Sequence, residues 1–167
     1  MALTVPLPDA GATERLGQLI GRRAPPGTLL RLRGPLGAGK TSLVQAVARG
    51  LGIPDDAGVR SPSFALMRVH EQGRLPLVHV DLYRLVDVDE LVDLGLEDWF
   101  DGDALVAVEW VDRFPDAFAE FGLEIELCYR EGDGQGRDAV LAADGDHAAA
   151  LLEEIEAVLM EEGTLGG

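Results

Sequence analysis

The sequence predicts an α/β fold in which a central mixed sheet is flanked by helices and extended by additional antiparallel strands. Three features predict it. Short apolar runs alternate with helical spacing, one such run leads through a glycine-rich loop into a helix, and two strand-like segments near the C-terminus flank a glycine-rich turn. At 167 residues the chain is most simply one domain. We expect this domain to span residues 1–162, with a frayed tail at 163–167.

Apolar spacing, with glycine and proline at the breaks, predicts the elements of the N-terminal third in order. A short strand at 3–7 precedes a helix that Asp9 or Thr13 can cap and that runs to about Arg22. A second strand at 28–33 follows the Pro26-Gly27 break, and a second helix at 42–51 ends at Gly52.

The rest of the chain continues this alternation. The pattern predicts strands at 64–69 and 75–82 joined by a turn at Gln72-Gly73, an acidic helix at 87–94, and a strand at 104–108 that is apolar on both faces. An antiparallel hairpin at 124–129 and 138–142 and a final helix at about 146–160 complete the order.

The loop between the second strand and the second helix carries the most specific motif. Its residues Gly34-Pro35-Leu36-Gly37-Ala38-Gly39-Lys40-Thr41 match G-x-x-x-x-G-K-[ST] at every fixed position. Lys40 is the only lysine beside thirteen arginines, and a compact ammonium suits a place between phosphates where a planar guanidinium does not. The sequence therefore predicts a P-loop domain that binds a nucleoside triphosphate, with Lys40 at the outer phosphates and the Thr41 hydroxyl on Mg²⁺.

Two carboxylates could complete such a site. Glu109 directly follows the apolar run 104–108, where a strand end would bring it beside the phosphates. In His79-Val80-Asp81-Leu82-Tyr83, alternation places His79, Asp81 and Tyr83 on one face of a strand. One acid would help to hold Mg²⁺ and the other would orient the attacking water or take its proton, and spacing alone does not assign the two roles.

Composition excludes several classes of protein. The formal charge is −16, from thirty acidic and fourteen basic residues, so tight binding to RNA or DNA by this chain alone is not expected. No apolar run approaches the roughly eighteen residues of a membrane span, and the N-terminus lacks the pattern of a signal peptide. With the lone Cys128 expected as a buried small hydrophobe, these points favour a cytoplasmic protein.

The three histidines carry weaker signals. His70 and His147 have no partners at motif spacing and are expected at the surface or in a hairpin. His79 is expected to be packed and hydrogen-bonded rather than to act as a catalytic base.

Four segments together resemble one family. They are the P-loop at 34–41, Ser61-Pro62-Ser63-Phe64, His79-Val80-Asp81-Leu82-Tyr83-Arg84 and Val108-Glu109-Trp110. In order and spacing the chain resembles the bacterial TsaE (YjeE) ATPases, which act in making the N6-threonylcarbamoyl modification of adenosine in tRNA. The resemblance covers roughly residues 3–145; the P-loop alone is generic, whereas the set of four is specific. Ser63 departs from the threonine frequent in the family, although a hydroxyl is retained.

The resemblance implies roles for individual residues. Asp81 would be the catalytic or water-positioning acid, assisted by Lys40, and Thr41 with Glu109 would hold Mg²⁺. Residues 61–64 would form a switch-like loop near the γ-phosphate. The residues implied to bind ATP are Thr13, Gly37, Ala38, Gly39, Lys40, Thr41, Ser42, Glu109, Trp110 and Arg137.

The resemblance also implies partners. The family acts with the TsaD and TsaB proteins, which carry out threonylcarbamoyl transfer, so this chain would hydrolyse ATP to reset their complex and would meet tRNA only through them. Such a role fits the acidic charge of the chain, because it does not require this protein to grip tRNA itself.

The residues bear on three alternatives, of which the kinase and the regulatory subunit stay open and the GTP-dependent switch is closed in its usual form. A small-molecule kinase would need arginine-bearing lid segments, and the region after the P-loop helix offers mainly Arg60. A GTP-dependent switch would normally use an Asn-Lys-x-Asp segment, but the chain has no asparagine and no second lysine. A nucleotide-binding regulatory subunit without turnover is also compatible with the same residues.

Overall fold

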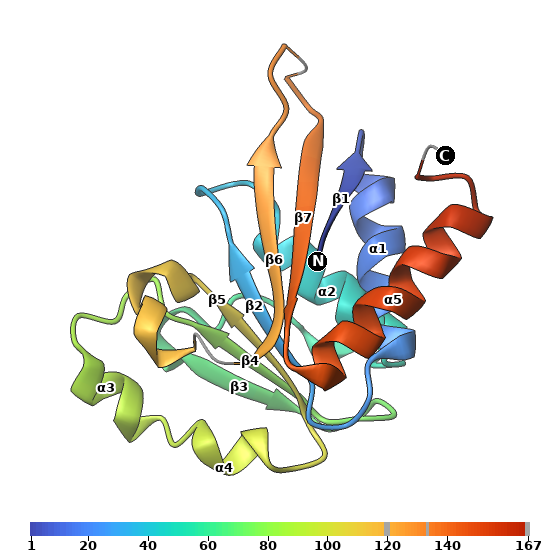
Figure 1. Cartoon of the computed structure of the whole chain (residues 1–167). Coiled ribbons are helices and arrows are strands. Elements are labelled where there is room, and N and C mark those ends of the chain that lie inside the picture. Colours follow the sequence, from blue (N-terminus) through green and yellow to red (C-terminus); the bar gives the residue numbers. More distant parts are fainter. Residues whose placement is uncertain (119–120, 133, 166–167) are drawn as a thin grey trace.

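The predicted α/β architecture is confirmed in a computed structural model that describes residues 1–118, 121–132 and 134–165. Figure 1 shows a twisted mixed sheet in which the described part of the chain forms seven strands in the order β1-β7-β6-β2-β5-β4-β3. Their bounds are Ala2–Leu7 (β1), Leu29–Arg33 (β2), Met67–His70 (β3), Leu77–Asp81 (β4), Leu105–Glu109 (β5), Gly122–Tyr129 (β6) and Arg137–Asp144 (β7).

Helices cover both faces of the sheet. The helix bounds are Ala10–Arg23 (α1), Lys40–Gly50 (α2), Val88–Asp93 (α3), Glu97–Phe100 (α4) and Asp146–Glu161 (α5). Helices α1, α2 and α5 lie over one face, and α3 and α4 lie toward the other (Figure 1). Within the described residues no helix is long and apolar enough to cross a bilayer.

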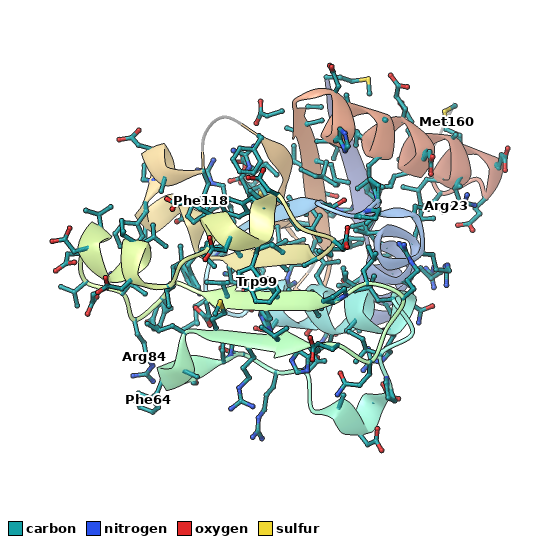
Figure 2. All side chains as sticks on the ribbon, turned by 90° about the horizontal axis from the view of Figure 1, so that it is seen from below. Arg23, Phe64, Arg84, Trp99, Phe118 and Met160 are labelled. Carbon is teal, nitrogen blue, oxygen red and sulfur yellow. The ribbon has the colours of Figure 1, made fainter. Side chains whose placement is uncertain are left out.

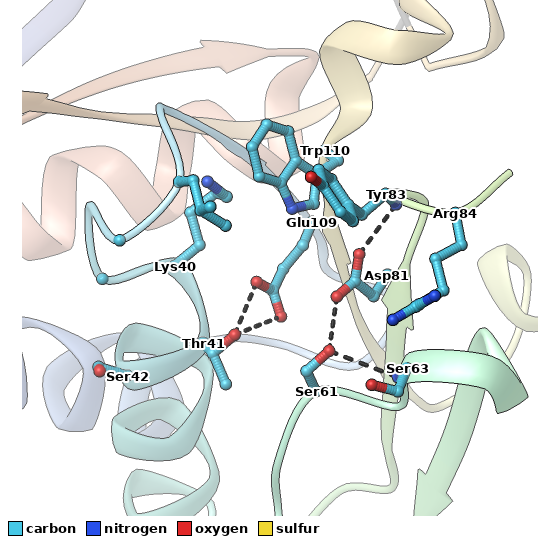
Figure 3. A pocket seen from close by; sticks show the side chains of 13 residues that line it. Lys40, Thr41, Ser42, Ser61, Ser63, Asp81, Tyr83, Arg84, Glu109 and Trp110 are labelled. Atoms are coloured by element: carbon cyan, nitrogen blue, oxygen red, sulfur yellow. Dashed lines mark hydrogen bonds between the residues drawn. The ribbon is translucent and has the colours of Figure 1, made fainter.

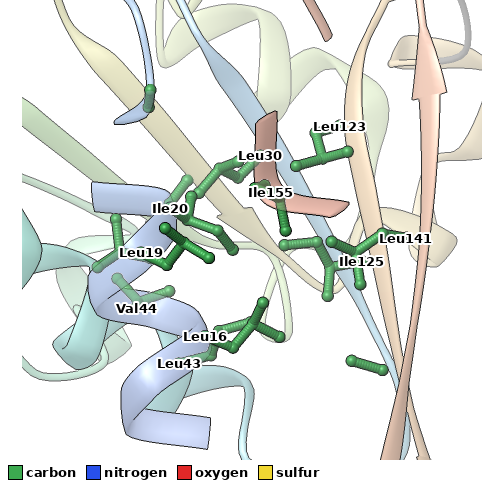
Figure 4. Packing of buried hydrophobic residues seen from close by; sticks show 14 of the residues in the cluster. Leu16, Leu19, Ile20, Leu30, Leu43, Val44, Leu123, Ile125, Leu141 and Ile155 are labelled. Carbon is green, nitrogen blue, oxygen red and sulfur yellow. The ribbon is translucent and has the colours of Figure 1, made fainter. Parts of the chain in front are cut away.

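The alternation of strand side chains builds a hydrophobic core on each face. In β5, Leu105 and Ala107 belong to the core under α1, α2 and α5, whereas Val106 and Val108 belong to the core under α3 and α4. A strand covered on both sides needs apolar residues at every position, which is why this run is continuously hydrophobic. Figure 4 shows the larger core, where side chains of α1, α2 and α5 meet those of β2, β6 and β7.

The direction of the strands places four chain segments at one edge of the sheet. Strand β2 pairs in parallel with β5 and β6, and β4 pairs in parallel with β5, so these four strands end on the same side. The predicted hairpin of β6 and β7 is antiparallel, as are the pairings of β1 with β7 and of β3 with β4. The P-loop, Asp81, Glu109 and Tyr129 therefore converge at a single edge, where ligands of open α/β sheets bind.

Glycines let α1 approach α2 closely. A methyl group added at Gly17 would stand 2.4 Å from Cβ of Ala46, and one added at Gly21 would stand 2.2 Å from the carbonyl oxygen of Val47. Backbone therefore packs on backbone here, and larger side chains would push the helices apart. This contact fixes α1, which carries Thr13, against the helix that follows the P-loop.

The structure settles some element boundaries and corrects one. Asp9, not Thr13, caps α1, because its carboxylate accepts the N–H of Ala12 at 2.8 Å. The strand predicted at 64–69 is wrong in its first half, which is a short 3₁₀ helix, Ser63–Ala65. Leu66, inside the predicted strand, has φ of 60°, whereas residues of a regular strand have a negative φ. Helix α4 was not anticipated from the pattern.

At the C-terminus, the residues after α5 return toward the core. The N–H groups of Thr164 and Leu165 donate to the carbonyl of Leu159, and Leu165 is half-buried against the larger core. The remainder of the predicted tail, Gly166 and Gly167, lies outside the described residues, as does Asp133 in the turn between β6 and β7.

Candidate active site

The glycine-rich loop has the backbone of a phosphate cradle. Gly34, Gly37 and Gly39 have φ of 137°, 78° and 106°, a region that residues with a Cβ rarely adopt. Gly39 is the N-cap of α2, and the first intrahelical bond runs from the N–H of Leu43 to its carbonyl at 2.9 Å. The N–H groups of the first turn are thus available to an anion, with the helix dipole behind them.

This loop borders a cavity of about 360 Å³ that gathers most of the predicted site residues (Figure 3). Lys40, Thr41 and Ser42 enter it from the P-loop side, Asp81 from the end of β4, and Glu109 and Trp110 from the end of β5. The other residues that line it are Leu36, Gly37, Gly39, Ser61, Ser63, Tyr83 and Arg84.

Thr41 and Glu109 meet directly. The Thr41 hydroxyl donates to Oε1 of Glu109 at 2.9 Å and lies 3.2 Å from its Oε2. Glu109 is only 2% exposed, and a carboxylate at such a position requires partners for its oxygens. The pair offers hydroxyl and carboxylate oxygens at one point, which is the type of ligand that Mg²⁺ prefers.

Lys40 is buried, and its ammonium is turned onto the loop that carries it. Its Nζ donates to the carbonyls of Gly34 at 2.6 Å and Pro35 at 3.0 Å, and lies 3.8 Å from the ring centroid of Trp110. Loss of hydration lowers the pKa of Lys40, although nearby Glu109, Asp112 and Asp81 oppose that shift. The ammonium thus lies beside the cavity, and its present partners are two backbone carbonyls and an aromatic ring, which the phosphates of a ligand could replace.

Trp110 forms an aromatic wall of the cavity together with Tyr83. Their ring centroids are 4.9 Å apart at an interplanar angle of 43°. Trp110 has φ of 63°, so the backbone turns sharply right after Glu109 and brings the indole over Lys40. Such a left-handed tryptophan is unusual and is held here by its surroundings.

Asp81 has partners different from those of Glu109. Its Oδ2 accepts the hydroxyl of Ser61 at 2.6 Å, and its Oδ1 accepts the N–H of Tyr83 at 2.9 Å. Ser61 belongs to the predicted switch-like loop, so this hydrogen bond ties the loop to the end of β4 inside the cavity.

The outer part of that loop faces away from the protein. The Phe64 side chain is 83% exposed, and the guanidinium of Arg84 lies 4.2 Å from its ring centroid. Figure 2 shows both residues projecting from the same edge of the molecule. The loop is therefore tied to the end of β4 by Ser61 on its inner side, and on its outer side its exposed Phe64 contacts only the Arg84 guanidinium among the ring contacts of the described residues.

Thr13, Ala38 and Arg137 lie apart from this first cavity. They line a second cavity of about 560 Å³, which shares Gly37, Gly39 and Ser42 with the first. The two hollows thus adjoin across the P-loop, one over the carboxylates and one between α1 and the β6–β7 hairpin.

Tyr129 is a residue that the sequence reasoning missed. Its hydroxyl donates to the carbonyl of Leu36 at 3.0 Å, and the guanidinium of Arg137 lies 4.1 Å from its ring centroid. Tyr129 therefore connects the P-loop to the hairpin that carries Arg137. No sequence signal pointed to this contact, since the two ends lie 93 residues apart.

His79 is the second residue whose contact the sequence reasoning did not identify. As expected, it is packed and hydrogen-bonded, with Nε2 2.5 Å from Oε2 of Glu109 and no measurable exposure. The polar alternation of β4 located the residue, and only the pairing of β4 with β5 shows its partner.

Two other titratable residues lie away from the site. His70 is in the β3–β4 hairpin but is buried rather than on the surface, and desolvation lowers its pKa. Cys128 is half-buried in β6, where desolvation and then Glu126 and Asp138 raise the pKa of its thiol, so it is a poor nucleophile.

Comparison with known proteins points to a single family. A sequence profile of the family described as "Threonylcarbamoyl adenosine biosynthesis protein TsaE" matches residues 7–138. The chain is similar to the tRNA threonylcarbamoyladenosine biosynthesis protein TsaE of Bacillus subtilis, with 37% identity over 86% of this chain and 87% of that protein. The protein of the same name from Synechocystis is 43% identical over 65% of this chain and 70% of its own length.

A solved structure agrees with the sequence matches. The crystal structure of YdiB from Bacillus subtilis superimposes with a TM-score of 0.78 at 29% identity, covering 94% of this chain and 95% of that one. The profile covers more than half of the chain and the Bacillus subtilis relative nearly all of it, so this chain belongs to the TsaE family of threonylcarbamoyl adenosine biosynthesis proteins.

Proposed function

We propose that this chain is a P-loop ATPase that binds and hydrolyses ATP with Mg²⁺ in support of the threonylcarbamoylation of adenosine in tRNA. The observation that carries the proposal is the convergence of Lys40, Thr41, Asp81 and Glu109 on one cavity next to a helix N-terminus. A cation, a hydroxyl and two carboxylates around a loop of left-handed glycines is the donor set that phosphoryl transfer from a nucleotide needs.

The residues present fit both a triphosphate and Mg²⁺. Gly37, Gly39 and the N–H groups at the start of α2 would bind phosphate oxygens, and Lys40 would leave the carbonyls of Gly34 and Pro35 for the outer phosphates. Thr41 and Glu109 would hold the ion. When bound, Mg²⁺ supplies charge neutralisation at the phosphate oxygens and needs few protein ligands.

Asp81 is proposed to orient the attacking water and to accept its proton. The hydrogen bonds from Ser61 and from the N–H of Tyr83 hold its carboxylate at the cavity wall, and Asp81 is 8% exposed. A carboxylate fixed in this way can serve as a general base without paying for reorientation at each turnover.

The second cavity is proposed to take the nucleoside end of ATP. It adjoins the first across Gly37, Gly39 and Ser42, so one extended ligand could occupy both. Thr13 and Arg137 would then bind on the far side of the P-loop from the carboxylates, in accord with the roles that the resemblance implies.

We further propose that the chain works with TsaD and TsaB in the cytoplasm and meets tRNA only through them. Relatives that match most of this chain are named for tRNA threonylcarbamoyladenosine biosynthesis. A formal charge of −16 supports an indirect role, because a strongly acidic surface repels the phosphate backbone of tRNA.

The proposal is tested by measuring ATP hydrolysis by the purified protein in Mg²⁺, alone and with a TsaB–TsaD pair. We expect slow turnover alone and faster turnover with the pair. Turnover that ignores the pair would favour an independent kinase-like enzyme, which a search for a phosphorylated acceptor would then test. Nucleotide binding without turnover under both conditions would favour a regulatory subunit.

A further inference from the structure

We propose that His79 is a positioning residue that orients the Glu109 carboxylate toward a bound Mg²⁺. The inference rests on the proposed function and adds to it a residue that has no assigned role. Within the described part of the chain, the Glu109 carboxylate has hydrogen bonds to two side chains, Thr41 from the P-loop and His79 from the sheet, and the inference concerns the second.

The sheet makes His79 a diagonal neighbour of Glu109 on the adjacent strand. In the pairing of β4 with β5, Asp81 is opposite Glu109 and His79 is opposite Ala107. Because side chains two residues apart share a face, His79 lies one step back from the strand end on the face that α2 covers. Its Nε2 is 2.5 Å from Oε2 of Glu109, and neither residue is more than 2% exposed.

The direction of this hydrogen bond follows from the chemistry of the partners. An ionised carboxylate only accepts, so Nε2 of His79 carries the proton and donates it to the hydrogen bond. Nδ1 is buried and has no partner among the described residues. A buried ring that leaves one nitrogen unpaired while the other makes a short bond is oriented chiefly by Glu109.

The Glu109 carboxylate is held by donors from two different elements. Thr41 donates from the P-loop and His79 from the sheet (Figure 3 shows the Thr41 side). Thr41 is itself a proposed ligand of the ion, so its contact with Glu109 must adjust when the ion binds. His79 is not a ligand and can keep the carboxylate in place throughout, as partners of metal ligands commonly do.

This role can be separated from simple core packing. Substitution of a residue that only packs in the core would lower stability and would weaken nucleotide binding equally with and without Mg²⁺. A residue that orients Glu109 affects the dependence of binding on Mg²⁺ and leaves Mg²⁺-free binding nearly unchanged. The matched variants are His79→Leu, which keeps bulk without a donor, and His79→Gln, whose amide nitrogen can take the place of Nε2.

The experiment measures ATP affinity by tryptophan fluorescence, with Trp110 at the cavity as the reporter, in EDTA and across a Mg²⁺ titration. We expect His79→Leu to raise the Mg²⁺ concentration at which the gain in ATP affinity is half-maximal by about tenfold or more. Loss of a residue that hydrogen-bonds to a metal ligand typically has an effect of this size. Its affinity in EDTA should stay close to wild type, and His79→Gln should recover most of the loss.

A Mg²⁺ requirement unchanged in His79→Leu, or an equal loss with and without Mg²⁺, would overturn the inference. If His79→Leu does not fold, His79→Asn replaces it, because its shorter amide stays polar but cannot reach the position of Nε2. A wild-type protein whose ATP binding ignores Mg²⁺ would overturn the proposed function itself, which distinguishes that failure from failure of the His79 assignment.

Discussion

Asp81 and Glu109 lie opposite each other at the ends of two neighbouring parallel strands, yet their carboxylates bind different partners. Asp81 accepts from Ser61 and from the N–H of Tyr83, whereas Glu109 accepts from Thr41 and His79. Two acids in one cavity with separate partners are suited to separate tasks, and the contact with Thr41 is the reason we propose Glu109 as the ligand of the ion. Sequence spacing left the division of roles open, and these partners are the basis of the division that we propose and that mutation can test.

The first prediction concerns Glu109. Glu109→Ala should weaken ATP binding in Mg²⁺ by about tenfold or more and change binding in EDTA much less, because a charged oxygen ligand is lost. Glu109→Gln is the matched control for size. The measurement is ATP affinity by fluorescence or calorimetry under both conditions, and equal losses in the two would assign Glu109 a purely structural role.

Asp81→Asn should keep nucleotide binding and lose hydrolysis. The amide still reaches Ser61 and Tyr83 but cannot take a proton from water, so we expect a fall in kcat of about 10²-fold or more. Single-turnover kinetics with ATP would measure it. Ser61→Ala, which removes a donor to Asp81 without removing the acid, should have a smaller effect, and unchanged turnover in Asp81→Asn would move the catalytic role elsewhere.

Lys40→Ala should lose most of the affinity for triphosphate. The ammonium is the single cation of the P-loop, and its charge-assisted hydrogen bonds contribute about 1.5–3 kcal/mol each, which corresponds to at least tenfold in affinity. Equilibrium binding of ATP and ADP would show a greater loss for ATP. Wild-type affinity in Lys40→Ala would contradict the P-loop assignment.

The buried ammonium also makes stability depend on pH. Its pKa in the folded state is lowered by loss of hydration, so between that pKa and the ordinary lysine value the unfolded state binds more protons. The contribution of Lys40 to the free energy of unfolding should therefore rise as pH increases through that interval. Urea unfolding of wild type and Lys40→Met at several alkaline pH values would check this, and a difference between them that falls with pH would contradict it.

Gly21→Ala tests the close packing of α1 on α2. The added methyl would stand 2.2 Å from the carbonyl of Val47, and we expect a loss of about 1–3 kcal/mol in the free energy of unfolding. Gly11→Ala, in the same helix, is the control, because its methyl would meet only the side chains of Asp9 and Arg15 at 3.2 and 3.4 Å. Equal stabilities of the two variants in urea denaturation would show that the helices can separate without cost.

Much of the site was predictable because its signals are local. The P-loop is a run of eight residues whose glycines adopt the left-handed backbone that the motif needs. The run 105–108 is hydrophobic throughout because both faces of β5 are covered, and Glu109 emerges where that run stops. The alternation of polar and apolar residues in the strand also located Asp81, since His79 and Asp81 alternate with Val78 and Val80.

What the sequence by itself determined is the α/β class, the P-loop and the acids at two strand ends, because each depends on neighbouring residues and their backbone preferences. Tertiary structure alone decided the hydrogen bonds of His79 with Glu109 and of Tyr129 with Leu36. It also decided that α2 packs closely against α1 at Gly17 and Gly21. The two hydrogen bonds join residues that are 30 and 93 positions apart in the sequence. The geometry of these contacts depends on the order and register of the strands and on how closely the helices approach. No local pattern encodes those distances, which is why the fold had to be seen before the partners of each acid could be named.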